Sequence, residues 1–155
     1  MNAYESLEDE ARKDSIDIIP YHFRNDKLKG LYCDGVIGLN KDIDTTTEKA
    51  CVLAEELGHH YTTVGNILDL EDPANRKQER RARLWGYDKL IGLHGIINAY
   101  EAGCRSSYEI ADYLGVTEEY LQECIGAYRE KYGTGARIGE YYLMFEPRVA
   151  VGRIV

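Results

Sequence analysis

The chain has 155 residues, of which 44% are apolar and 30% are charged, a composition that is typical of one folded domain and excludes a wholly disordered protein. Its net charge of −8 opposes binding to phosphate backbones unless a local basic patch overrides the field. There is no CxxC pair, no apolar signal-peptide stretch at the N-terminus, and no apolar run long enough to span a membrane. These features predict a reduced, cytoplasmic protein without a membrane partner.

The first 40 residues predict a short helix followed by a small antiparallel sheet. Tyr4, Leu7 and Ala11 recur at helical spacing near the N-terminus. Strands are expected at residues 16–23, 28–33 and 36–40, and a proline at position 20 is typical of an edge strand or an early end. The dipeptide Asp34-Gly35 lies between the second and third strands, where it predicts a tight hairpin, because both turn positions need positive φ.

The rest of the chain is predominantly helical. Thr45 and Glu48 form a capping-box pattern before a run of apolar residues at three- and four-residue steps, and Asp72-Pro73 predicts the start of another helix that runs to about residue 90. Further helices are expected at about 91–102, 107–114 and 117–131, before an extended tail. The fold class is therefore α+β and helix-dominated. We expect a core at residues 1–92 and a C-terminal helical extension at 93–155 packed on it.

The sequence LAEELGHHYTT, which begins at Leu53, contains residue types that bind metal ions. Glu55 and His59 are four residues apart, so they share one face of a helix and can hold one ion, with Cys51 a turn earlier as a spare ligand or a core residue. Glu56 then takes the place of the base that accepts a proton from the attacking water in zinc-protease helices. The alternative register puts Leu57 in that place, where no proton can be accepted. On its own, the pattern is also that of an ordinary acidic helix.

A glutamate in the next helix is a candidate third ligand. Glu79 shares a helix face with Ala82 and Gly86, whose small side chains allow another helix to approach closely. We therefore expect Glu79 to point inward, where a carboxylate must be paired or bound to metal. The basic residues of this segment should point outward or sideways; they are Arg76, Lys77, Arg80 and Arg83. The alternative is a salt bridge between Glu79 and one of these arginines.

Together the hairpin, the capped helix with ELGHH and the following Glu79-Arg80-Arg81-Ala82 segment resemble the ImmA/IrrE metallo-endopeptidases, which are often encoded by phages and mobile elements. The resemblance covers residues 15–92 and implies a zincin-like fold. The sequence from about 100 to 147 is similar to the C-terminal part of phage members. By resemblance, Glu55 occupies the first ligand position, Glu56 is the general base, His59 is the second ligand and Glu79 the third. The family implies cleavage of a helix-turn-helix repressor.

The departure from the family pattern is Glu55, because a histidine normally begins the HExxH motif. With Glu55 and Glu79 ionised and His59 neutral, two negative charges cancel those of Zn²⁺, whereas a His₂Glu site keeps one positive charge. A less positive centre is a weaker Lewis acid, and oxygen ligands also suit Mn²⁺ or Mg²⁺. We therefore expect zinc, with Mn²⁺ or another divalent ion as the alternative, and an enzyme that is slower or shifted in metal preference.

Two further elements concern the substrate. The strand at residues 36–40 directly precedes the metal-binding helix, so Val36, Gly38 and Asn40 are the candidates to pair with an extended peptide; an ordinary hairpin strand is the alternative. His60 is a candidate to support a ligand or contact the substrate.

The C-terminal part contains a helix-turn-helix look-alike in the sequence YEIADYLGVTEEYLQECI, with Gly115 at the turn. Six acidic residues oppose three basic ones between Arg105 and Lys131, and Glu118 and Glu119 begin the would-be recognition helix. We therefore predict a structural helix pair or a protein-binding surface rather than a DNA reader. The sequence leaves two alternatives to the peptidase: a non-catalytic antirepressor that binds a repressor, and a DNA-binding regulator.

Overall fold

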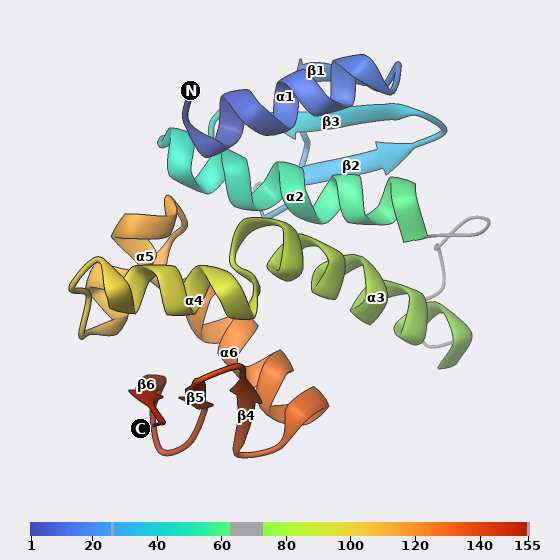
Figure 1. Cartoon of the computed structure of the whole chain (residues 1–155). Helices are drawn as coiled ribbons and strands as arrows, with labels where there is room; N and C mark the ends of the chain where they lie inside the picture. Colours follow the sequence, from blue (N-terminus) through green and yellow to red (C-terminus); the bar gives the residue numbers. More distant parts are fainter. Residues whose placement is uncertain (26, 63–72, 155) are drawn as a thin grey trace. The chain divides into compact units, whose positions relative to one another are not determined.

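The computed structural model describes residues 1–25, 27–62 and 73–154, with the side chains of 73–75 not described. The chain forms two compact units, Met1–Lys89 and Leu90–Val155 (Figure 1). The first contains α1 (Ala3–Lys13), β1 (Asp17–Tyr21), β2 (Gly30–Cys33), β3 (Val36–Asn40), α2 (Thr46–Thr62) and nearly all of α3 (Pro73–Leu90). The second contains α4 (Gly92–Glu101), α5 (Ser107–Leu114), α6 (Glu118–Tyr132), β4 (Gly135–Ile138), β5 (Tyr141–Met144) and β6 (Ala150–Arg153).

Local signals in the sequence set the ends of the first elements. Asn2 caps α1 by accepting a hydrogen bond from the backbone N–H of Glu5, and the Thr45 hydroxyl accepts one from the N–H of Glu48 at the start of α2. Asp34 and Gly35 have φ values of 46° and 80°, as the predicted hairpin turn requires. The predicted cap of α3 at position 72 lies outside the described residues.

The first sheet has the order β1-β3-β2. Its β2–β3 pair is antiparallel, as predicted, whereas β1 joins β3 in parallel. Ile37 and Leu39 of β3, the central strand, are buried. The prediction that β1 is an edge strand is confirmed.

The helix that carries the ELGHH sequence packs across this sheet. α2 contacts β2 and β3, and α1 contacts α2 and β1 (Figure 1). Leu53, Ala54 and Leu57 of α2 are fully buried and, together with Leu7 and Ala11 of α1, form the core of this unit. The remaining face of α2, which carries Glu55 and His59, is left for α3.

The C-terminal unit contains the predicted helix pair and a sheet of its own. Gly115 adopts the left-handed conformation between α5 and α6, and Leu121 is fully buried. The tail forms an antiparallel sheet of order β4-β5-β6, in which β4 was not predicted from the sequence. None of the helices in the described residues is long and apolar enough to cross a membrane.

α2 and α3 touch through their backbones. A Cβ atom built on Gly58 of α2 would lie 2.1 Å from the carbonyl oxygen of Ala82 in α3, a separation that real atoms do not adopt. Ala82 is fully buried, which confirms that its face of α3 points toward another helix. One turn beyond Gly58, Tyr61 stacks on Trp85 with ring centroids 5.0 Å apart. These two contacts fix how α3 lies on α2.

Gly58→Ala should therefore damage the first unit. Its methyl group has to push the Ala82 backbone away, so we expect a loss of about 1–3 kcal/mol in the free energy of unfolding, measured by urea denaturation. Gly126→Ala in α6 is the matched control, because the nearest atom to its added Cβ lies 4.0 Å away on a flexible arginine. That control should be neutral or stabilised by about 0.5–1 kcal/mol. Equal stability of the two variants would contradict the close crossing.

Candidate metal centre

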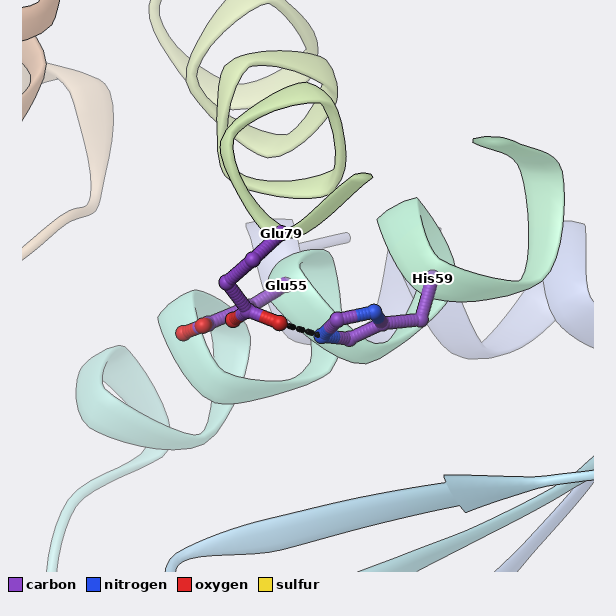
Figure 2. Close-up of side chains that lie close together, drawn as sticks. All are labelled: Glu55, His59 and Glu79. Carbon is purple, nitrogen blue, oxygen red and sulfur yellow. Dashed lines mark ion pairs between the residues drawn. The ribbon is translucent and has the colours of Figure 1, made fainter. Parts of the chain in front are cut away.

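The close crossing brings three predicted ligands together. Glu55 and His59 lie one turn apart on α2, and Glu79 points toward them from α3 (Figure 2). The Nε2 atom of His59 lies 3.2 Å from Oε2 of Glu79. One ligand atom from each of the three side chains falls within 4.8 Å of the others, and among the described residues this is the group found with metal-ligand geometry. Cys51 is buried and is not part of that group.

The charges of the three side chains are strongly coupled. Burial raises the pKa of Glu55, an effect that the nearby Arg83 guanidinium partly offsets. The hydrogen bond from His59 holds the pKa of Glu79 below its usual value. Burial acts to lower the pKa of His59, but the hydrogen bond to Glu79 and its charge outweigh burial and raise it. The acidic neighbours of His59 thus make its imidazole easier to protonate, and its Nε2 atom lies within hydrogen-bond distance of the Glu79 carboxylate.

Glu56 occupies a different environment on the same helix. Its side chain is only 8% exposed, and Oε2 has no hydrogen-bond partner among the described residues. It lies over β2, where a Cβ on Gly30 would come within 3.1 Å of the Glu56 Cγ. Burial raises its pKa to about 7, and the charges of His59, Glu55 and Glu79 also act on it. A carboxyl group with this pKa can both accept and release a proton near neutral pH.

Arg83 is a further member of the site, which the sequence offered only as one of several arginines able to pair with Glu79. Its Nε atom lies 3.2 Å from Oε1 of Glu55 and 3.5 Å from Oε1 of Glu79. Its side chain is 53% exposed, in agreement with the prediction that Arg83 points outward or sideways, and its guanidinium nevertheless reaches both carboxylates. The signal was its position one turn after Glu79 on the same helix face. The salt bridge considered as the alternative for Glu79 thus coexists with its contact to His59.

The prediction that β3 binds the substrate peptide is wrong. β3 is the central strand, paired with β1 on one side and β2 on the other, so Val36, Gly38 and Asn40 have no open edge for a peptide. Asn40 is buried and donates its side-chain N–H to the Leu28 carbonyl. The error arose because the β1–β3 pairing could not be read from the sequence. Among the described strands of this sheet, β2 provides the edge beside α2.

His60 contacts the hairpin rather than the three ligands. Its Nδ1 atom lies 2.7 Å from the Tyr32 hydroxyl, which also accepts a hydrogen bond from the N–H of Gly35. The rings of Tyr32 and Tyr61 both meet the imidazole edge-on. His60 therefore ties the end of α2 to β2, and its role toward a ligand or a substrate stays a prediction.

Comparison with known families matches residues 11–125 to Peptidase M78, the IrrE N-terminal-like domain. The match covers most of the chain and includes α2 and α3. The chain belongs to this peptidase family. Neither curated proteins nor solved structures gave a match.

Membership of Peptidase M78 implies a metal-dependent peptidase, and the three side chains fit a divalent ion. Ligand atoms of a tetrahedral zinc ion are about 3.3 Å apart, close to the 3.2 Å between His59 and Glu79, and a small movement brings Glu55 to the same distance. The buried, unpartnered oxygen of Glu56 beside them is a second observation in favour of a reactive centre, because such a group is otherwise unfavourable.

The raised pKa of Glu56 predicts how metal-free protein responds to pH. Because the folded-state pKa is about 7 and the ordinary value is 4.5, the folded state holds its proton more tightly, and stability falls as the pH rises between these values. In the presence of a chelator, Glu56→Gln should gain stability relative to wild type from pH 5 to pH 8, by about 3 kcal/mol or less, in urea unfolding. The exposed Glu119→Gln is the control and should show no such gain. A pH-independent difference for Glu56→Gln would contradict the burial of a titrating carboxyl group.

Proposed function

We propose that this protein is a metal-dependent endopeptidase whose centre is formed by Glu55, Glu56, His59 and Glu79. The observation that carries the proposal is the convergence of Glu79 on His59 from a second helix, beside a buried carboxyl group with one oxygen that no group in the described part of the chain satisfies. A protein that needed only stability would gain from an apolar residue at position 56, since an unpaired buried carboxyl group is destabilising.

The protein's own residues divide the work of hydrolysis. Glu55, His59 and Glu79 would hold a divalent ion, which when bound polarises the scissile carbonyl and makes water easier to deprotonate. Glu56 accepts the proton of the attacking water at a carboxylate oxygen and delivers it to the nitrogen of the leaving amine. Its pKa near 7 suits both transfers. We propose zinc as the ion, with Mn²⁺ as the alternative because two of the three ligands are carboxylates.

The substrate peptide is proposed to pair with the outer edge of β2. Cys33 and Val36 flank a two-residue turn and form a hydrogen-bonded pair, so the alternation of the ladder directs the backbone groups of Gly30 and Tyr32 away from β3. Gly30 is also the residue against which Glu56 packs. An extended peptide on this edge would therefore pass the catalytic carboxyl group. This proposal replaces the prediction that assigned the role to β3.

By resemblance to the phage members, the proposed substrate is a helix-turn-helix repressor of a mobile element, cleaved in the cytoplasm. The same resemblance supports a second function. The ion pairs from Arg83 to Glu55 and Glu79 satisfy two of the proposed ligands without any metal. A protein of this kind could bind a repressor and inactivate it without cleavage.

Cleavage assays separate the two functions. Purified wild-type protein is incubated with zinc or Mn²⁺ and a helix-turn-helix repressor, and products are identified by mass spectrometry. We expect cleavage by wild type, a loss of about 10²-fold or more for Glu56→Gln with metal binding retained, and no cleavage or metal binding for Glu79→Ala. Glu119→Gln is the control with full activity. An intact repressor held in a stable complex by wild-type protein and metal would establish the binding function instead.

A further inference from the structure

The guanidinium of Arg83 already occupies the carboxylates that a divalent ion would use. It faces Glu55 and Glu79 at 3.2 and 3.5 Å, and it comes from the helix that carries Glu79. The two oxygens of Glu79 have different partners, because Oε1 faces Arg83 and Oε2 faces His59. Arg83 and His59 therefore approach the same carboxylate from two directions. A metal ion that binds both glutamates has to share them with the permanent positive charge of Arg83.

The presence of Arg83 matches the presence of Glu55. In the form that binds a metal ion, His59 is neutral. Two ionised carboxylates and this neutral imidazole carry a charge of −2, and the guanidinium brings the cluster to −1. A cluster of two neutral histidines and one carboxylate also carries −1. Arg83 thus offsets the extra negative charge that Glu55 introduces. A histidine at position 55 would give the guanidinium no carboxylate to pair with there.

We propose that Arg83 sets the affinity of this centre for divalent ions by holding Glu55 and Glu79 in the metal-free protein and competing with the ion for them. The inference rests on the metal centre of the proposed function. Two like charges a few ångströms apart near a protein surface repel by an energy that changes a dissociation constant by about tenfold or more. Binding of the ion therefore weakens the attraction between Arg83 and the two carboxylates, and the guanidinium, which is 53% exposed, has room to move into solvent.

Metal affinity of the Arg83 variants tests this competition directly. Zn²⁺ and Mn²⁺ affinities are measured by competition with a chromophoric chelator for wild type, Arg83→Ala, Arg83→Gln and Arg83→Lys, with folding checked by circular dichroism. We expect both neutral variants to bind at least about tenfold more tightly than wild type, and Arg83→Lys, which keeps the charge, to stay within about threefold. Arg81→Ala is the matched control, since it removes the same charge from an exposed position of the same helix. It should leave affinity unchanged.

A double-variant cycle tests whether Arg83 acts through Glu55. In Glu55→His protein only Glu79 remains for the guanidinium, so removal of Arg83 should increase zinc affinity by less than it does in the wild-type background. An equal increase in both backgrounds would refute the pairing of these two residues.

The outcomes distinguish this inference from the proposed function. If wild type binds zinc and neither neutral variant binds it more tightly, the competition is refuted and the metal centre stands. If wild type binds weakly and the neutral variants bind well, Arg83 is the determinant of affinity. If wild type and every Arg83 variant fail to bind either ion, the metal centre and the competition are both refuted.

Discussion

The backbone contact between Gly58 and Ala82 is the constraint on which the site depends. A side chain at position 58 would move α3 away from α2, and Glu79 would leave His59 with it. The same approach places Arg83 over both carboxylates, because it follows Glu79 by one turn. One pair of small residues thereby determines the geometry of the ligands and of the cation that competes for them. The Tyr61–Trp85 stack adds a second point of attachment one turn away.

The polar side chains of the site have partners on one side of α2, whereas on the other side one carboxyl oxygen lacks a partner among the described residues. Toward α3, Glu55, His59, Glu79 and Arg83 pair with one another, so that this cluster is satisfied without any ion. Toward the sheet, Glu56 is buried with an oxygen that no neighbour satisfies within residues 1–25, 27–62 and 73–154. Unsatisfied buried groups in an otherwise well-packed protein occur mostly where chemistry requires them. The contrast between the two faces points to position 56 as the place where function outweighs stability.

Features governed by short-range rules could be predicted from the sequence. The hairpin at Asp34-Gly35, the cap at Thr45 and the inward face of Glu79 depend on neighbouring residues or on helical spacing, and all are present. The order of strands was not predictable, since parallel pairing of β1 with β3 joins segments separated by the hairpin and leaves no local pattern. The contact between Arg83 and Glu55 was not predicted for a similar reason. Its direction depends on Glu55, a residue 28 positions earlier on another helix.

The two borders of the first sheet differ in their capacity to accept another strand. The N–H of Asp17 bonds to Gly35 and the carbonyl of Tyr21 accepts from Lys41, so alternation turns the backbone of Pro20 outward, where its missing N–H interrupts the ladder. The border formed by β1 is thus guarded against strand addition, whereas the border beside Glu56 has no proline. One edge of the sheet can therefore pair with another polypeptide while the other cannot. Copies of the protein are thereby hindered from adding to both edges and forming extended β-fibres.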